Sequence, residues 1–214
     1  MPTYDDALET YLRTLFGHEE DAFTDIRDRT VAAGLPQIMI RPEEGRFLEF
    51  LAGVVAARNA LEIGTLGGYS ASWIARGLDE GGRLLTVERD PERAGLAREN
   101  LERVGLADRV EVRVGDAHAL QSELSAEGPF DLIFIDAEKE GYPDYYKWAV
   151  ENLRAGGILA AHNALSHGAV ADPEDQRDRT KALRWFNERL ASDAHFVSLI
   201  FPAGDGIVFG LKRS

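Results

Sequence analysis

The sequence predicts an α/β protein with a seven-stranded, mostly parallel sheet, a C-terminal antiparallel hairpin, helices on both faces and an N-terminal helical cap. From residue 60 onward, short apolar segments alternate with segments of helical periodicity, which is typical of parallel strands joined by right-handed crossovers. The strand segments are almost continuously apolar, as in residues 132–135, which indicates that both faces of the sheet are covered. The last two strand segments are separated only by residues 202–206, so they must run antiparallel.

Residues 1–57 are expected to form the helical cap, and residues 58–214 the core of a single domain. Within the cap, residues 3–33 should form one or two amphipathic helices, which end at the glycine and proline that follow. A further helix begins near Pro42, a residue tolerated in a first helical turn, and two glutamates after it suit the positive end of the helix dipole. We expect these helices to cover the sheet, to roof a pocket or to form a dimer contact.

The core elements follow from the strand–helix alternation. The predicted strands are residues 60–63, 83–88, 110–114, 131–136 and 158–163. The predicted helices between them are residues 69–78, 91–104, 119–124 and 142–153. A last helix is expected around residues 180–190, and the terminal hairpin at residues 195–201 and 207–212.

Composition and charge exclude several classes of protein. The 214 residues include no cysteine, which excludes disulfides, thiolate metal sites and cysteine nucleophiles and fits a cytoplasmic location. No apolar run is long enough to span a bilayer, and no N-terminal signal pattern is present. The formal net charge of −13, without a basic patch, argues against a nucleic-acid partner.

A glycine-rich turn separates the first core strand from the helix after it. Gly64, Gly67 and Gly68 lie in this turn, where the lack of a Cβ lets a ligand approach the backbone. The free N–H groups at the start of the following helix favour an anionic group. The turn is therefore either an ordinary strand–helix connection or part of a nucleotide or nucleoside site at the carboxyl end of the strand.

Two acidic residues follow later strands of the same sheet. Glu88 ends the second strand, about twenty residues past the glycines, where an acid can accept hydrogen bonds from ribose hydroxyls. Asp116 follows the third strand and could accept from an adenine amino group, although Gly-Asp is also common in turns. The glycine spacing departs from G-x-G-x-x-G, which weakens a nicotinamide interpretation.

Polar residues end the fourth and fifth strands. Asp136 offers a carboxylate, and His162 and Asn163 offer an imidazole and an amide oxygen. Such a set could bind a divalent cation, with the imidazole favouring a transition metal over Mg²⁺, or could form a hydrogen-bonded cluster without a metal. Lys139 could be a general base if a nearby cation lowers its pKa, and otherwise is a surface lysine.

The ordered set of motifs resembles the S-adenosylmethionine-dependent O-methyltransferases, above all the cation-dependent group with catechol and caffeoyl-CoA O-methyltransferases and small bacterial members. The motifs are residues 61–64, 68–70, 84–88, 115–117, 134–139 with Tyr142, 156–158 and 204–206. The resemblance covers residues 35–212 and implies a Rossmann-like seven-stranded methyltransferase fold with S-adenosylmethionine as cofactor.

The resemblance also implies roles for single residues. The positions that would contact the cofactor are Ile40, Glu62, Gly64, Gly68, Ser70, Glu88, Asp116, Ala117, Asp136 and Glu138. Among them, Glu62, Gly64 and Ser70 would hold the methionine part. Asp136 and Asn163 would be the first and third metal ligands, and Lys139 the catalytic base.

His162 departs from the family pattern, in which an Asp-Asn dipeptide supplies the second and third metal ligands. Three outcomes are open: the metal is retained with a histidine ligand, the metal binds more weakly, or the metal is lost and His162 becomes a base. His167 corresponds to a position that contacts substrate in some relatives, and it could equally be a solvent-facing loop residue.

The resemblance implies methyl transfer to a hydroxyl of a small, catechol-like or other vicinal-diol acceptor, assisted by a divalent metal (Mg²⁺, Mn²⁺ or similar) in a homodimer. Two alternatives remain open: methylation of a tRNA wobble-uridine hydroxyl, and a cofactor-binding protein whose catalysis is altered by His162. A nicotinamide oxidoreductase is a more distant alternative.

Overall fold

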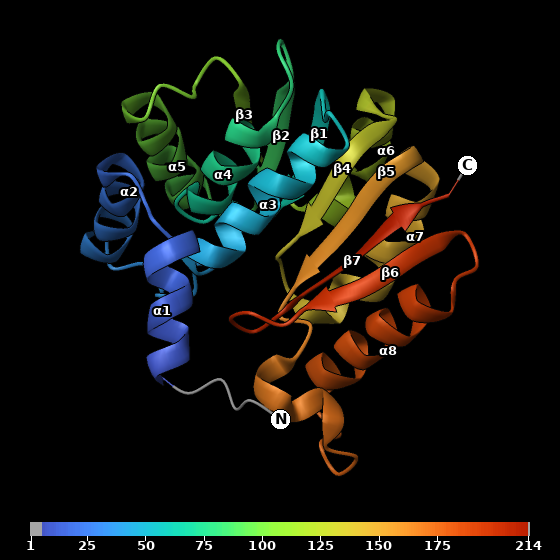
Figure 1. The fold of residues 1–214 in the computed structure, drawn as a ribbon. Coiled ribbons are helices and arrows are strands. Elements are labelled where there is room, and N and C mark those ends of the chain that lie inside the picture. Colours follow the sequence, from blue (N-terminus) through green and yellow to red (C-terminus); the bar gives the residue numbers. More distant parts are fainter. Residues whose placement is uncertain (1–5, 214) are drawn as a thin grey trace.

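The computed structural model describes residues 6–213, and seven strands of this part form one mixed sheet (Figure 1). The strands are β1 (Asn59–Ile63), β2 (Arg83–Glu88), β3 (Val110–Val114), β4 (Phe130–Ile135), β5 (Leu153–His162), β6 (Phe196–Phe201) and β7 (Ile207–Lys212). Their order in the sheet is β3-β2-β1-β4-β5-β7-β6. β1 to β5 pair in parallel, and β7 is antiparallel to both β5 and β6. The predicted fold class is therefore confirmed.

Helices cover both faces of the sheet. They are α1 (Asp6–Phe16), α2 (Asp21–Ala32), α3 (Pro42–Val54), α4 (Tyr69–Gly77), α5 (Pro91–Arg103), α6 (Ala117–Glu127), α7 (Tyr142–Asn152) and α8 (Asp178–Ser192), with short 3₁₀ segments at Lys139–Gly141 and Ser166–Ala171. Buried side chains of α2 to α5 pack on one face, and those of α6 to α8 pack on the other. The predicted first helix includes residues 3–5, which lie outside the described part of the chain.

The side-chain alternation of β4 explains the two cores. Leu132 and Phe134 belong to the core beneath α2 to α5, whereas Ile133 and Ile135 belong to the core beneath α6 to α8. All four side chains are fully buried. Successive side chains of a strand point to opposite faces, so a strand covered on both faces needs an apolar residue at every position.

Two elements extend further than the sequence predicts. β5 begins at Leu153, not at residue 158, because the chain stays in the sheet through Gly156 and Gly157 with a register irregularity opposite β4. Gly156 adopts φ +72°, a backbone conformation that lets the strand continue past the irregularity. α6 spans Ala117–Glu127, although only the middle of this segment has a clear helical apolar pattern.

The cap helices lie against the sheet on the α2–α5 side. α3 begins at Pro42 as predicted, and its buried Leu48 and Leu51 join the core. Ile38 and Ile40, in the segment between α2 and α3, line the cavity described below, so part of the cap roofs a pocket. None of the helices in residues 6–213 has the length and apolar character needed to cross a membrane.

Candidate active site

A cavity of about 550 Å³ opens at the carboxyl ends of the parallel strands. Its wall includes the ends of β1, β2, β3 and β4 and the segments that follow them. The sheet order places β2 on one side of β1 and β4 on the other, so the crossovers leave in opposite directions at this point. An open α/β sheet binds its ligands in the crevice that such a reversal creates.

The glycine turn after β1 forms one wall of this cavity. Gly64 has φ +99°, and a Cβ at this position would overlap with the carbonyl of Asp136. A Cβ at Gly67 would overlap with the hydroxyl of Thr30 on α2. Gly68 does not line the cavity; in a left-handed conformation (φ +83°) it begins α4 instead. The glycines therefore let β1, β4 and the cap approach one another around an open pocket.

Glu62 lies beneath this turn and is completely buried. Its Oε2 accepts a hydrogen bond of 2.6 Å from the hydroxyl of Thr86, while its Oε1 has no hydrogen-bond partner among the described residues. Burial raises the pKa of this carboxyl to about 8, and the hydroxyl groups of Ser70 and Thr86 oppose the shift only in part. A buried carboxyl with one free oxygen fits a site that receives a positively charged group of a ligand.

Two acids line the cavity as predicted. Glu88 accepts hydrogen bonds from the backbone N–H groups of Leu66 (2.9 Å) and Asp90 (3.0 Å), which fix its carboxylate at the end of β2. Asp116 precedes α6 and caps it by accepting from the N–H of His118 at 2.9 Å. The structure brings both acids to the same wall as the glycine turn.

A stacked pair of rings, which the sequence did not reveal, stands beside Glu138. The rings of His118 and Tyr145 lie 4.2 Å apart, nearly parallel. The Nε2 of His118 and the hydroxyl of Tyr145 are 2.9 and 2.7 Å from Oε1 of Glu138, which lines the cavity. Only the nearness of His118 to the Gly-Asp-Ala motif could have indicated this group; Tyr145 gave no signal of its own.

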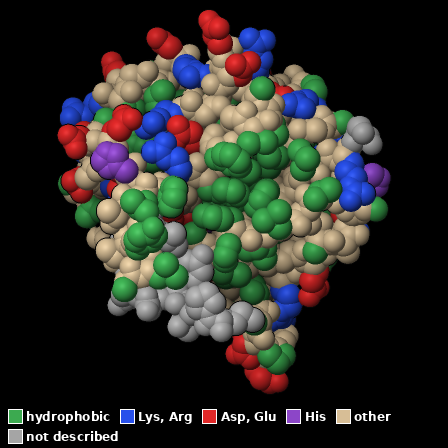
Figure 2. Space-filling model, viewed as in Figure 1, with side chains coloured by type: hydrophobic (Ala, Val, Ile, Leu, Met, Phe, Trp, Pro, Cys, Tyr) green, Lys and Arg blue, Asp and Glu red, His purple; other side chains and the backbone are tan. Residues whose placement is uncertain are grey.

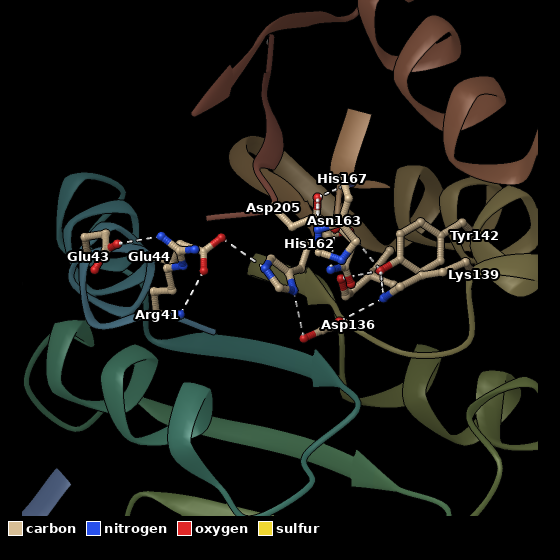
Figure 3. A network of polar contacts seen from close by, with 11 residues as sticks. Arg41, Glu43, Glu44, Asp136, Lys139, Tyr142, His162, Asn163, His167 and Asp205 are labelled. Atoms are coloured by element: carbon tan, nitrogen blue, oxygen red, sulfur yellow. Dashed lines mark hydrogen bonds and ion pairs between the residues drawn. The ribbon is translucent and has the colours of Figure 1, made fainter. Parts of the chain in front are cut away.

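Asp136 and Lys139 lie side by side at the cavity wall (Figure 3). The Nζ of Lys139 is 2.9 Å from Oδ1 of Asp136 and 2.9 Å from the hydroxyl of Tyr142. Burial alone would lower the pKa of Lys139, but the carboxylate of Asp136 outweighs this and raises it above its ordinary value. The raised pKa does not favour the base role of Lys139, which stays a prediction.

His162 is placed behind Asp136 and does not line the cavity. Its Nδ1 is 3.2 Å from Oδ2 of Asp136, and its Nε2 is 3.0 Å from Oε1 of Glu44 (Figure 3). Burial alone would lower the pKa of His162, but the carboxylates of Asp136 and Glu44 raise it to about 10. For Asp136 the signs are reversed: burial alone would raise the pKa of this carboxyl, but the cations Lys139 and His162 hold the pKa well below its usual range.

Glu44 is a site residue that sequence reasoning missed. It comes from the first turn of α3 and is only 1% exposed. Its Oε2 accepts a 2.8 Å hydrogen bond from the N–H of Arg41, and the turn at Gly204 covers it closely enough that a Cβ there would overlap with the carboxylate. The sequence offered only a glutamate suited to a helix dipole, which applies equally to the neighbouring Glu43.

Asn163 lines the cavity, but its amide contacts a different carboxylate. Its Nδ2 donates a 2.9 Å hydrogen bond to Oδ2 of Asp205, in the turn between β6 and β7. Asp205 also accepts from the backbone N–H of His167 at 2.5 Å. The side chain of His167 is 85% exposed at the cavity mouth, where contact with a substrate stays a prediction.

Comparisons with known proteins agree with this arrangement. The family model described as O-methyltransferase matches residues 15–213. This chain belongs to the O-methyltransferase family. It is 42% identical over 186 residues to a catechol O-methyltransferase of Mycobacterium tuberculosis, covering 85% of this chain and 84% of that one. It is 39% identical over 190 residues to a catechol O-methyltransferase of Niastella koreensis, covering 88% and 86% of the two chains.

A solved structure shares the fold throughout. The O-methyltransferase from Bacillus cereus in complex with SAH superposes with a TM-score of 0.89 at 36% identity, and the match covers 96% of this chain and 97% of that one. The resemblance inferred from the motifs is thus confirmed, and the chain is an S-adenosylmethionine-dependent O-methyltransferase. A nicotinamide oxidoreductase is no longer an alternative.

The O-methyltransferase cavity suits the cofactor of the family. Its lining includes the predicted contacts Ile40, Gly64, Ser70, Glu88, Asp116, Ala117, Asp136 and Glu138. Glu62 lies beneath this wall with its free Oε1, and backbone groups line the turn where no Cβ intervenes. These features fit the ammonium, ribose and adenine of S-adenosylmethionine. The assignment of each contact stays a prediction.

The three side chains predicted to bind a metal differ in how well their donor atoms are placed for an ion. Within residues 6–213, no group of three or more His, Cys or Asp/Glu side chains is arranged to hold a metal ion. Both ring nitrogens of His162 face carboxylates, and the Nδ2 of Asn163 donates to Asp205. The imidazole nitrogens are thus engaged with other protein groups, whereas the amide oxygen of Asn163 is not the atom that contacts Asp205.

Proposed function

We propose that this O-methyltransferase transfers the methyl group of S-adenosylmethionine to a hydroxyl of a small, catechol-like aromatic acceptor. The observation that carries the proposal is the ion pair of Lys139 and Asp136 at the wall of the cofactor cavity. Asn163 and His167 line the same cavity and leave polar groups beside the pair. The acceptor class is supported by two relatives, both named catechol O-methyltransferase.

In this proposal the cofactor occupies the cavity from the glycine turn to the stacked rings. Glu62 and Ser70 receive its methionine part, Glu88 its ribose hydroxyls, and the Asp116–Ala117 backbone its adenine. When bound, S-adenosylmethionine supplies an activated methyl, whose bond to sulfur breaks with the electron pair left on sulfur as the acceptor oxygen bonds to carbon and loses its proton. The protein's own task is to align and charge-stabilise that oxygen.

Lys139 is suited to charge stabilisation of the acceptor oxygen. Its ammonium keeps its proton because Asp136 raises its pKa, and a fixed cation beside a phenolic hydroxyl favours the phenolate form. Asp136 and Tyr142 hold the ammonium by two hydrogen bonds, so little reorganisation is needed when charge develops. We therefore assign Lys139 as an electrostatic stabiliser, and the phenolic proton leaves to solvent.

The test is methyl transfer to a panel of catechols, measured by formation of S-adenosylhomocysteine and of the monomethylated product. Lys139→Met should lower kcat/KM by about 10²-fold, the usual effect of removing a preorganised charge, while S-adenosylhomocysteine affinity changes little. Lys147→Met, which removes an exposed lysine from α7, is the matched control and should keep full activity. Unchanged transfer by Lys139→Met would refute the assignment.

The same assay separates the two alternatives. Tight binding of S-adenosylhomocysteine without turnover on any hydroxylated acceptor would favour a cofactor-binding protein without catalysis. A salt-sensitive complex with tRNA would favour a nucleic-acid acceptor. The net charge of −13 opposes that second outcome, because nucleic-acid binding requires positive charge at the phosphates.

A further inference from the structure

We propose that His162, fixed between Glu44 and Asp136, takes the place of a divalent metal, so that this enzyme transfers methyl groups without one. The consequence for catalysis rests on the proposed methyl transfer, whereas the contacts of His162 with Glu44 and Asp136 do not depend on it. It chooses among the three outcomes that the sequence left open at residue 162.

The hydrogen bonds of His162 leave no lone pair for a metal. A carboxylate accepts hydrogen bonds and cannot donate them. Because Nδ1 faces Asp136 at 3.2 Å and Nε2 faces Glu44 at 3.0 Å, both nitrogens must carry a hydrogen and donate it. A histidine binds a metal through an unprotonated nitrogen, so this imidazole cannot be a ligand without losing one of its carboxylate partners.

Asp136, the first predicted ligand, is also engaged. Lys139 holds Oδ1 of Asp136 and His162 holds Oδ2, so each carboxylate oxygen already faces a cation. Asn163 donates its Nδ2–H to Asp205, so its amide oxygen is the one predicted donor that these contacts do not engage. A divalent ion bound to either oxygen of Asp136 would lie beside a protein cation, Lys139 or His162.

The charges of the cluster already balance. Two carboxylates, Glu44 and Asp136, face two cations, Lys139 and His162. The four side chains are between 1% and 20% exposed. A further charge of +2 in so buried a place would lack a compensating carboxylate, and burial of an uncompensated charge is costly.

Glu44 is held in place by three segments, which makes the arrangement a built feature of the fold. α3 supplies the residue, the N–H of Arg41 donates to its Oε2, and the β6–β7 turn approaches it at Gly204. Gly204 has φ +60° and no Cβ, so the turn can close over the carboxylate. The cap thus places a second carboxylate beside residue 162. A protonated imidazole at 162 can donate a hydrogen bond to this carboxylate. A carboxylate at 162 would be repelled by it unless a cation lay between the two.

His162 acts through Asp136 and not on the substrate, because it does not line the cavity. It is therefore a positioning residue: it holds one oxygen of Asp136, and the other oxygen holds Lys139 at the acceptor. In this scheme the cation of the cluster that faces the acceptor region is Lys139, which belongs to the protein, and no ion is needed to bridge two acceptor oxygens.

The experiment compares metal binding by the wild type and by His162→Asp. The wild-type protein, freed of metal, should leave the electron paramagnetic resonance signal of aqueous Mn²⁺ unchanged, and its methyl transfer should change less than about twofold in EDTA, since no Lewis acid takes part. His162→Asp places a third carboxylate beside Glu44 and Asp136, and should bind one Mn²⁺ and lose activity in EDTA. Circular dichroism and the unfolding midpoint establish that the variant is folded.

Each outcome decides the proposal. Binding of one Mn²⁺ by the wild type, or loss of its activity in EDTA, overturns it. A folded His162→Asp that takes up no Mn²⁺ also overturns it, because the imidazole would then not be what keeps the ion out. If neither protein methylates any acceptor, the proposed function fails, and the Mn²⁺ signals still decide the metal question. If His162→Asp does not fold, the Mn²⁺ titration of the wild type alone decides the metal question.

Discussion

At the scale of single residues, Glu62 shows how burial prepares a charge for a ligand. In the free protein its pKa is about 8, because burial favours the neutral form. At pH 7 the carboxyl is thus mostly protonated in the free protein. An ammonium placed near the unpartnered Oε1 would favour the ionised form and lower the pKa.

We predict that S-adenosylhomocysteine binding at pH 7 releases up to about one proton, and that affinity therefore rises with pH between about 6 and 8, by at most ~tenfold per unit. The sign follows from linkage: the complex holds fewer protons than the free protein, so removal of protons favours the complex. Calorimetry in two buffers of different ionisation enthalpy measures the proton count. Glu62→Gln should release none, and the exposed Glu102→Gln on α5 should behave as the wild type. Proton uptake on binding would contradict the prediction.

Glu44 is a second residue whose role depends on burial. Glu44→Gln keeps the shape of the side chain but takes a negative charge away from His162. We expect the free energy of unfolding at pH 7 to fall by about 3–5 kcal/mol, the usual result of removing one partner of a buried charge pair. Urea unfolding measures it.

Glu43→Gln is the matched control for that change. It removes a charge from the same helical turn, and its ion pair with Arg41 is long, at 3.9 Å. The loss of unfolding free energy caused by Glu43→Gln should be ~0.5–1 kcal/mol, the value of a charge at a helix N-terminus. Equal losses in the two variants would show that the contact with His162 contributes nothing beyond the helix dipole.

These two residues also show what the sequence could not reveal. Glu62 and Asp136, which directly follows β4, were predicted from motifs, because a strand end and a glycine turn determine their place locally. Glu44 and Glu43 look alike in sequence, and only the docking of α3 against β5 and the β6–β7 turn buries one of them beside His162. That docking depends on contacts between segments more than 100 residues apart.

At the scale of elements, three strands have the bounds that the sequence predicts. The bounds of β2, β3 and β7 agree with the prediction to the residue. The start of β5 was predicted five residues too late, because two glycines usually end a strand and here accompany a register irregularity. α6 was predicted too short at both ends, because it buries few of its side chains and so lacks a full apolar stripe.

The β6–β7 turn offers a test of how an element closes over the site. Gly204→Ala should lower the free energy of unfolding by about 1–2 kcal/mol, because alanine disfavours the left-handed backbone. A further loss is expected because the new Cβ would displace the carboxylate of Glu44. Gly34→Ala is a matched control, since Gly34 has φ +75° but no heavy atom within 4 Å of a built Cβ. Denaturant unfolding measures the loss of stability in both variants, and the difference between the two losses is the contribution of the contact between residue 204 and Glu44. Equal costs would mean that the turn yields without disturbing Glu44.

At the scale of the whole molecule, one face carries an apolar patch over α3, β7 and β6 (Figure 2). Large apolar side chains exposed in this region include Phe50 and Val54 on α3, Val197 and Leu199 on β6, and Leu211 on β7. β6 ends the sheet order, so its outer edge has no neighbouring strand among the described residues. Monomers rarely expose a contiguous apolar patch beside an open strand edge.

We propose that a second copy of this chain covers the patch, in line with the dimer expected from the sequence. Sedimentation at micromolar concentration should give twice the chain mass of 23.6 kDa. Phe50→Glu combined with Leu199→Glu should give the monomer, because each buries a charge in an apolar contact. Val31→Glu, which places the same charge on an exposed apolar position of α2, should leave the dimer intact. A wild-type protein that sediments as a monomer, or a double variant that remains dimeric, would mean that another surface or no surface joins two copies.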